Sequence, residues 1–357
     1  MVQHLEAHDK KLFSRTLPSL TGALVPVKWL RRWSRRRFGS AGDGEPMATL
    51  LTQGIIYGEA PRFRPREGKL YYVDSYANSV RRFDPMTGQD EIVATHDDYV
   101  PGLGWLPDGR LLVVSMKKQQ VLVLDEATRS FELYADLRGV VRDAANDMVV
   151  SSSGEVYVGN CGFDFINSMG MYTTTLVRIA TDQSVHVEAT GLFFPNGSVI
   201  TPDGKTLLVA ETYGAKITAF DIMDDGSLQN QRIWANLKCP VNGMCLDAEG
   251  CVWVAVPQIG LYKTAGALLR VQEGGDIVST LGFGANGITR SVFACQLVTD
   301  PDGSHFLYFF EANTSNDNMI FKHGADHAKK NGVLKRIPVA VGPAVMAKNS
   351  NYSGGYC

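Results

Sequence analysis

A short apolar strand, a turn that ends in glycine and a second apolar strand recur six times between residues 55 and 341. The six turn glycines follow one another roughly every 40 to 50 residues. They are Gly68, Gly109, Gly154, Gly204, Gly250 and Gly303. Acidic or serine residues precede most of them, which is typical of hairpin turns because glycine adopts positive φ at little cost. The pattern predicts six copies of one strand–turn–strand unit.

Most units continue into a third and a fourth strand. In the first unit, for example, KLYYVDS is followed by SVRRFDP and EIVATHD. Four strands in a unit of this length are typical of a propeller blade. A β-sandwich or a β-solenoid is the alternative, but a sandwich has no reason to repeat a unit six times and solenoid repeats are shorter. The sequence therefore predicts an all-β, six-bladed β-propeller.

The two ends of the repeat region predict how the ring closes. The sixth unit has a third strand at 332–341 but no fourth strand after it, whereas ATLLTQG at 48–54 is a spare strand before the first unit. Pairing these segments would remove an exposed sheet edge. We expect a propeller over 47–345 and a C-terminal tail over 346–357.

Residues 1–46 differ from the rest of the chain. They carry five arginines between Arg31 and Arg37 and lack the apolar core and cleavage site of a secretory signal. This basic N-terminal extension is either an organelle transit peptide or an upstream segment, with Met47 as the natural start of the folded part. We expect it to be disordered and outside the fold.

Charge and cysteine usage exclude some partners. The 357 residues have a formal net charge of −2, and a nucleic-acid or anionic-membrane surface needs a concentrated basic face. No stretch has the roughly 18 consecutive apolar residues of a membrane span. None of the six cysteines forms a C-x-x-C pair, so reduced thiols and a cytoplasmic location are expected. The basic extension leaves organelle targeting open, and the sequence does not indicate the oligomeric state.

The repeat register predicts a ring of polar side chains. The first strand of each blade lines the central channel, so residues at equal distances before the turn glycines should lie at one depth. Residues at or within one position of this depth are Glu59, Gly102, Asn146, Asn196, Asn242 and Cys295. We expect Cys295 to be a small lining residue rather than a nucleophile, because no histidine stands at a corresponding position.

One carboxylate and three amides converging on one ring predict a metal site. Oxygen ligands suit a hard cation such as calcium, although a transition metal could substitute. The pairs Asn196–Gly197 and Asn242–Gly243 could instead be ordinary turn formers. Four such residues at matching offsets, each followed by an apolar strand, favour the metal site.

Three long connections should open on the same face as this ring: 161–175, 257–267 and 311–330. Long loops on a rigid scaffold often carry binding residues, and ordinary surface loops are the alternative. The first loop is aromatic and glycine-bearing, which suits a lid. It contains Asp164, a candidate substrate-binding residue.

Several short motifs stand in a fixed order along the chain: GEAPRF (58–63), NDMVV (146–150), GNCGFD (159–164), FPNGSVITPDGKTLLVAET (194–212), NGMCLDAEGCVWVA (242–255) and Ala294–Cys295. In these motifs the chain resembles the senescence marker protein/gluconolactonase family, the regucalcin-like lactonases. The resemblance runs from Gly58 to about Val341. It implies a six-bladed propeller with one catalytic divalent metal, and hydrolysis of sugar or related lactones.

The resemblance also implies roles for individual residues. The family's metal-binding glutamate matches Glu59, and its metal-binding asparagine matches Asn196. Its substrate-contacting asparagine matches Asn146. An arginine often found two residues before that asparagine is absent here, since Ala144 stands in its place.

The third metal ligand departs from the family pattern. The family has an aspartate, its favoured general base, where this chain has Asn242. An amide oxygen can bind calcium, but it has no charge and cannot accept a proton. We therefore expect weaker metal binding, with Glu59, Asp147 or a metal-bound hydroxide as the base.

These observations predict a metal-dependent lactonase in which an activated water attacks the lactone carbonyl. The catalytic candidates are Glu59, Asp147 and Asn242, and the metal-ligand candidates are Glu59, Asn196 and Asn242. Calcium is the first candidate metal, and zinc, manganese, magnesium and iron remain open. A non-catalytic metal-binding or ligand-binding propeller is one alternative, for which Asn242 is the main argument. A scaffold for protein partners is another.

Overall fold

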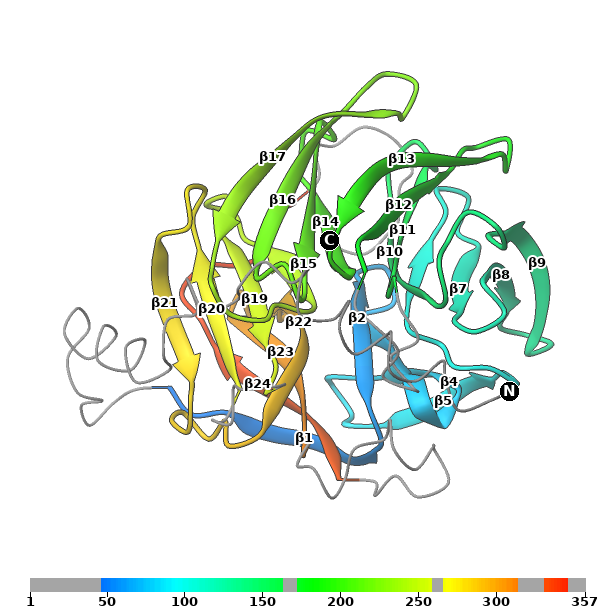
Figure 1. Ribbon diagram of the computed structural model, residues 1–357. Coiled ribbons are helices and arrows are strands. Elements are labelled where there is room, and N and C mark those ends of the chain that lie inside the picture. The colour runs from blue at the N-terminus through cyan, green and yellow to red at the C-terminus, as the bar shows by residue number, and fades with distance from the viewer. Residues whose placement is uncertain (1–45, 163–171, 259–265, 314–330, 346–357) are drawn as a thin grey trace, which may run out of the picture. The chain divides into compact units, whose positions relative to one another are not determined.

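The computed structural model describes residues 46–162, 172–258, 266–313 and 331–345. Their β-strands form six four-stranded antiparallel sheets, which are the blades of the propeller in Figure 1. The predicted extension 1–46, apart from Pro46, and the predicted tail 346–357 lie outside the described residues. The boundaries expected for these segments therefore stay predictions.

Each blade is given from its innermost strand outward. Blade 1 consists of β2 (Gly58–Arg64), β3 (Lys69–Asp74), β4 (Ser79–Phe83) and β5 (Asp90–Thr95). Blade 2 consists of β6 (Leu103–Trp105), β7 (Leu111–Ser115), β8 (Gln120–Asp125) and β9 (Ser130–Asp136). Blade 3 consists of β10 (Ala145–Val150), β11 (Val156–Asn160), β12 (Thr174–Ile179) and β13 (Val185–Leu192).

Blade 4 consists of β14 (Pro195–Ile200), β15 (Thr206–Glu211), β16 (Lys216–Ile222) and β17 (Leu228–Asn236). Blade 5 consists of β18 (Met244–Leu246), β19 (Val252–Val256), β20 (Ala267–Val271) and β21 (Ile277–Gly282). Blade 6 consists of β22 (Ser291–Thr299), β23 (His305–Ala312), β24 (Gly332–Pro338) and, as its outer strand, β1 (Thr49–Ile55).

The innermost strands form a closed ring. Strand β6 packs beside β2 and β10, β14 packs beside β10 and β18, and β22 packs beside β18 and β2. The ring is completed by β1, which pairs with β24 from Thr49 opposite Arg336 to Ile55 opposite Gly332 (Figure 1). The predicted six-bladed propeller and its closure by the N-terminal strand are both confirmed.

The turn chemistry that defined the repeat is present in all six hairpins. Every predicted turn glycine has a positive φ, between 66° at Gly68 and 98° at Gly154. Other residues rarely adopt this backbone conformation, so glycine is required to reverse the chain within so short a turn.

The core lies between neighbouring blades, which bury both faces of the middle strands. All five residues of β7 and all five of β19 are buried. This packing explains why these strands read as continuous apolar runs rather than as an alternation of apolar and polar residues. Between blades 2 and 3, for example, Leu112, Met148 and Val158 belong to one apolar cluster.

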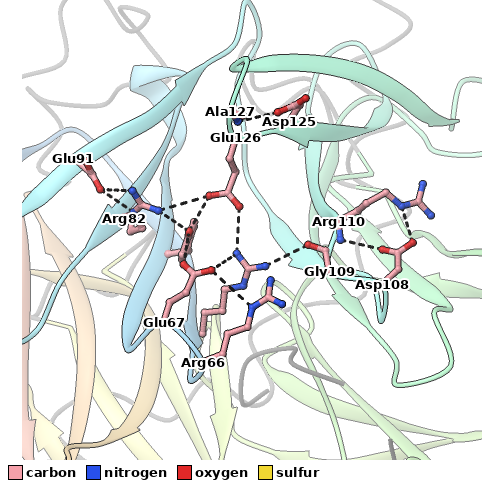
Figure 2. Close-up of polar contacts among 12 residues, drawn as sticks. Arg66, Glu67, Arg82, Glu91, Asp108, Gly109, Arg110, Asp125, Glu126 and Ala127 are labelled. Carbon is pink, nitrogen blue, oxygen red and sulfur yellow. Dashed lines mark hydrogen bonds and ion pairs between the residues drawn. The ribbon is translucent and has the colours of Figure 1, made fainter. Parts of the chain in front are cut away.

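A polar network joins blades 1 and 2 near their hairpin turns (Figure 2). Glu126 of blade 2 accepts hydrogen bonds from the Tyr71 hydroxyl at 2.9 Å and from Arg64 at 3.3 Å, both in blade 1. The Arg64 side chain is only 4% exposed, and its guanidinium lies 5.0 Å from the centre of the Trp105 ring. Because the charges are paired, we interpret this cluster as a structural link between the blades.

A half-buried histidine, which follows the outer strand of blade 1 and packs against blade 2, makes stability depend on pH. His96 Nε2 lies 3.1 Å from Ser115 Oγ, and the ring packs on Phe131. Burial lowers the pKa of His96 below 6.5, and Lys118 adds to this, whereas Asp97 and Asp98 oppose it. A lowered pKa means that the folded state prefers the neutral ring. Its contribution to stability is therefore full above pH 6.5 and is lost as the pH falls through the folded-state pKa.

We expect the His96→Gln variant to lose less free energy of unfolding than the wild type between about pH 7 and about pH 5. Glutamine keeps a polar group near Ser115 but does not titrate, and all other groups are shared. Urea unfolding at the two pH values measures the difference. Equal losses in the two proteins would show that His96 is not responsible.

The five cysteines of the described residues are buried free thiols. Cys245 and Cys295, from the innermost strands of blades 5 and 6, have their sulfur atoms 3.9 Å apart. Within the described ranges, no helix has the length and apolar character needed to cross a membrane.

Candidate functional site

Four of the six innermost strands carry a register shift at the depth of the predicted ring. The shifts lie between Glu59 and Arg62, between Ala145 and Met148, between Pro195 and Ser198, and between Val292 and Cys295. In each case the inner strand has one residue more than its partner, which is a β-bulge. Bulges interrupt the regular alternation of side chains and re-aim them. Asn146 and Asn196 lie inside such bulges, and Glu59 lies at the start of one.

Two of the predicted ring residues meet directly. Asn242 Nδ2 donates a hydrogen bond to Glu59 Oε1 at 3.3 Å. Glu59 belongs to blade 1 and Asn242 to blade 5, and blade 6 separates these blades in the ring. The contact therefore joins two blades that are not neighbours in the ring. The other amide atom, Asn242 Oδ1, is buried and has no hydrogen-bond partner among the described residues.

The Glu59 carboxyl group is in an environment that disfavours its charge. Burial raises its pKa well above the ordinary value, and the nearby Asp147 carboxylate raises it further. The hydrogen bonds from Asn242 and the Ala60 backbone and the charge of Arg62 act in the opposite direction but do not cancel the rise. A cation bound beside Glu59 would relieve this cost.

Asn196 lies directly beside Asn242. A Cβ atom on Gly197 would be 2.9 Å from the backbone oxygen of Asn242 and 2.6 Å from Gly243 Cα, so only glycine permits this approach. Asn196 is 6% exposed, and its Nδ2 donates to Thr212 Oγ1 at 3.1 Å. The Asn–Gly pairs thus allow the innermost strands of blades 4 and 5 to pack closely at the ring.

Asn146 is 7% exposed, and its Nδ2 has no hydrogen-bond partner among the described residues. Its strand, β10, lies between β6 and β14. Asn146 therefore offers a buried donor that a bound molecule could satisfy.

Asp147, the other candidate base, is held in an ion pair. Arg62 of blade 1 reaches it at 3.1 Å and also donates to the Met148 carbonyl at 2.8 Å. The Met148 amide donates to Asp147 Oδ1. A Cβ atom on Gly102 of blade 2 would lie 3.0 Å from that oxygen, so glycine leaves the space that Asp147 occupies. With its oxygens engaged, Asp147 is less available to accept a proton than Glu59.

We expect Arg62→Met to lower the free energy of unfolding by about 3–5 kcal/mol, because it leaves the buried Asp147 carboxylate without its partner. The two side chains of this pair are 13% and 8% exposed. In the control Arg232→Met, the side chains of Arg232 and its partner Asp221 are 42% and 37% exposed, and a much smaller cost is expected. Urea unfolding compares them, and equal costs would contradict a structural role for the Arg62–Asp147 pair.

Buried carboxylates at the ends of second strands anchor the segments that lead into the ring. Asp74 accepts hydrogen bonds from the backbone amides of Ile56 at 3.0 Å and Tyr57 at 2.8 Å, just ahead of Glu59. Glu211 accepts from the Phe193 amide at 2.9 Å, just ahead of Asn196. Glu311 accepts from the amides of Thr289 and Arg290 in blade 6. Sequence analysis missed these residues, although an acid ends the second strand in KLYYVD, KTLLVAE and HFLYFFE.

We expect Asp74→Ala to lower the free energy of unfolding by about 1–3 kcal/mol, because two buried amides lose their acceptor. The variant should also lose activity, since Glu59 follows this segment directly. The control is Asp84→Ala at an exposed turn, where the same change removes bonds to Met86 and Thr87. Retention of full activity in a destabilised Asp74→Ala protein would contradict the anchoring role.

The position expected for Cys295 is wrong. Gly243 N donates to the Phe293 carbonyl at 2.8 Å, so Phe293 and Ala294 lie beside Asn242 and Gly243. Strand β22 continues two residues further than β14 between its bulge and its turn, so counting back the same number of residues from the turn glycine stops two residues short of the ring. Cys295 instead belongs to a buried apolar cluster with Cys245 and Trp253.

The remaining candidate, Asp164, lies outside the described residues. So do most residues of the predicted long loops 161–175, 257–267 and 311–330. Their expected roles stay predictions.

The donor set at the ring fits a hard cation. In the described part of the chain, no group of three or more His, Cys, Asp or Glu side chains could hold a metal. The ring offers a different set, one carboxylate and several amides. Calcium accepts such oxygen ligands, whereas structural zinc sites favour sulfur and nitrogen. The unpartnered Asn242 Oδ1, next to the Glu59 carboxylate, is the observation that supports this fit.

Comparison with known proteins agrees with this architecture. The family model "SMP-30/Gluconolactonase/LRE-like region" matches residues 57–299. The chain is 26% identical over 255 residues to a pentonolactonase, XacC, from Haloferax volcanii, covering 69% of this chain and 84% of that protein. It is 23% identical over 281 residues to a gluconolactonase from Zymomonas mobilis, covering 70% and 79%.

Among solved structures, a calcium-binding protein, regucalcin, from Agrobacterium tumefaciens is similar in fold. It superposes with a TM-score of 0.65 at 17% sequence identity, covering 85% of this chain and 98% of that one. The family match spans most of the propeller and includes Glu59, Asn146, Asn196 and Asn242. The chain therefore belongs to the SMP-30/gluconolactonase/LRE-like family.

Proposed function

We propose that this protein is a metal-dependent lactonase that hydrolyses sugar-type or related lactones at the axis of the propeller. The observation that carries the proposal is the contact between Glu59 and Asn242 from two non-adjacent blades, with Asn242 Oδ1 buried and without a hydrogen-bond partner among the described residues. Relatives named pentonolactonase and gluconolactonase support the reaction class.

In this proposal Glu59, Asn196 and Asn242 hold one divalent cation, with calcium as the first candidate because all the donors are oxygen atoms. When bound, such a cation polarises a carbonyl group and lowers the pKa of a water molecule. The calcium-binding title of the regucalcin structure supports this choice.

The chain's own residues supply the proton transfers. Glu59 Oε1 accepts the hydrogen bond from Asn242, which leaves Oε2 to take a proton from the attacking water. The same carboxyl group then returns the proton to the ring oxygen as the lactone opens, giving a hydroxy acid. A bound cation would oppose the burial that raises the pKa of this carboxyl group and so favour its proton-accepting form. Asn146 Nδ2 would donate to the substrate and orient it.

A non-catalytic metal-binding or ligand-binding propeller is the second candidate. It is favoured by Asn242 itself, because this amide cannot accept a proton and adds no charge to the site.

The free thiols of the described cysteines agree with a reducing compartment, which supports a cytoplasmic location in either case.

Incubating the purified full chain with aldonolactones and with unsubstituted lactones tests the proposal. Acid release in a pH-stat measures the rate, and NMR identifies the product. We expect one hydroxy acid per lactone consumed, at a rate above the uncatalysed one. If the metal-replete protein hydrolysed none of these lactones, the lactonase proposal would be overturned. A non-catalytic metal-binding or ligand-binding function would then remain.

A further inference from the structure

Six aromatic side chains, which we call the aromatic arc, lie beside the ligand residues: Tyr57, Tyr76, Tyr99, Phe194, Tyr213 and Phe293. The first part of the arc is a series of ring contacts. The centroids are 4.2 Å apart for Phe293 and Tyr57, 5.1 Å for Tyr57 and Tyr76, and 4.9 Å for Tyr76 and Tyr99. This series begins in blade 6, continues through blade 1 and reaches the segment that enters blade 2.

The second part of the arc continues from blade 2 to blade 4. Tyr99 and Phe194 both pack against a small apolar cluster that contains Met116 and Ala144. Phe194 in turn stacks on Tyr213, with centroids 5.6 Å apart. Apolar contacts are therefore continuous from blade 6 through blades 1, 2 and 3 to blade 4.

The arc borders the proposed metal ligands. Tyr57 and Phe194 each stand two residues before a ligand residue, Glu59 and Asn196. Phe293 accepts a backbone hydrogen bond from the residue after Asn242.

Part of this apolar surface is accessible. Tyr213 is 39% exposed, and Tyr57, Tyr99 and Phe194 are half-buried. A ligand that covered these rings would remove apolar area from water, which favours binding.

Several polar groups of the ring are already paired within the protein. Among the described residues of the ring, the unpartnered buried side-chain atoms are Asn146 Nδ2 and Asn242 Oδ1. The Arg62 guanidinium is engaged by Asp147, and Asn196 Nδ2 by Thr212. A desolvated hydroxyl group without a partner costs binding free energy, and sites built for polyols supply a partner for each.

We propose that the substrate is a lactone with a hydrocarbon substituent, alkyl or aryl, that packs on the aromatic arc, rather than a polyhydroxylated sugar lactone. This inference rests on the proposed lactonase function and narrows its substrate class. The reacting ester lies at Glu59, and the apolar substituent covers Tyr57, Tyr99 and Tyr213.

The test compares two six-membered lactones with alkanol leaving groups, δ-nonalactone and D-glucono-1,5-lactone, each corrected for its uncatalysed hydrolysis. We expect kcat/KM to be at least about tenfold higher for δ-nonalactone, since even one methylene group in an apolar site changes specificity about 10- to 200-fold. An equal or higher value for the gluconolactone would overturn the inference but leave the lactonase function intact.

Variants of the aromatic arc test whether its side chains cause the preference for the alkyl lactone. Tyr99→Leu and Tyr213→Leu should each raise KM for δ-nonalactone about three- to tenfold and change KM for the gluconolactone by a smaller factor. The matched control is Phe131→Leu, which removes another half-buried ring from the outer strand of blade 2. Equal changes in KM for the control and the arc variants would overturn the assignment to the arc.

A binding measurement separates this inference from the proposed function. Calorimetric titration of the wild type with a 6-butyl δ-lactam and with D-glucono-1,5-lactam needs no turnover. At least about tenfold tighter binding of the butyl lactam supports the inference even if no lactone is hydrolysed. Equal or tighter binding of the sugar lactam overturns it.

Discussion

Replacing Glu59 with glutamine is expected to lower kcat/KM for the best lactone by about 10²- to 10⁴-fold, the range typical of a general acid–base group. Glutamine has nearly the same shape and can still accept the hydrogen bond from Asn242, so the geometry at 3.3 Å should persist. What disappears is the negative charge that would hold a cation and the oxygen that would take the proton from water.

Stability separates this loss of function from unfolding. A raised pKa means that the Glu59 environment stabilises the folded state only while the carboxyl is protonated. That contribution is lost as the pH rises through the folded-state pKa, so metal-free Glu59→Gln should be at least as stable as the wild type at neutral pH. The control Glu249→Gln changes an exposed carboxylate paired with Arg270 and should keep full activity. A Glu59→Gln protein with wild-type kcat/KM would contradict the assignment.

Replacing Asn242 with aspartate is expected to strengthen calcium binding and raise kcat/KM, each by at least about tenfold. The change is nearly isosteric, and it places a second carboxylate beside Glu59. Calcium affinity increases with the number of charged ligands, and the new carboxylate can also accept a proton. Calorimetry gives the affinity, and the lactone assay gives the rate.

The control for this prediction is Asn146→Asp, which adds the same charge at another ring position. If charge alone mattered, the two variants would improve calcium binding equally. We expect only Asn242→Asp to raise kcat/KM, because Asn242 is the amide in contact with Glu59. If the Asn242→Asp variant had a lower kcat/KM than the wild type, the amide would be required for activity and the proton acceptor would lie elsewhere.

The fold could be predicted from sequence because the same short-range sequence pattern recurs in each blade. Positive φ at a turn glycine and an apolar middle strand are short-range features, and both occur six times. Closure by β1 followed from one missing strand and one spare strand, which is a simple matter of edge pairing.

The site could be predicted only in part, because its details depend on bulges and on contacts between blades. Counting from the turns identified Glu59 and Asn242, which are in contact although their blades are not neighbours. The same counting failed for Cys295, because β22 has two extra residues between its bulge and its turn. The length of a strand beyond its bulge differs between blades, and the pattern at the turn does not show it.

The Arg62–Asp147 pair could not be predicted either. It joins blades 1 and 3 past Gly102, and no spacing along the chain relates these residues. The anchoring acids Asp74 and Glu211 had a visible signal at the ends of second strands. That signal becomes interpretable only once the chain segment opposite each carboxylate is known.

The most direct test of the metal-dependent lactonase account is the activity of the full chain before and after removal of its metal. The protein is dialysed against a chelator, its metal content is checked by elemental analysis, and lactone hydrolysis is measured with and without added calcium. We predict that metal-free protein loses at least about nine-tenths of its kcat/KM and that calcium restores it. Full activity in protein shown to be free of metal would contradict the account.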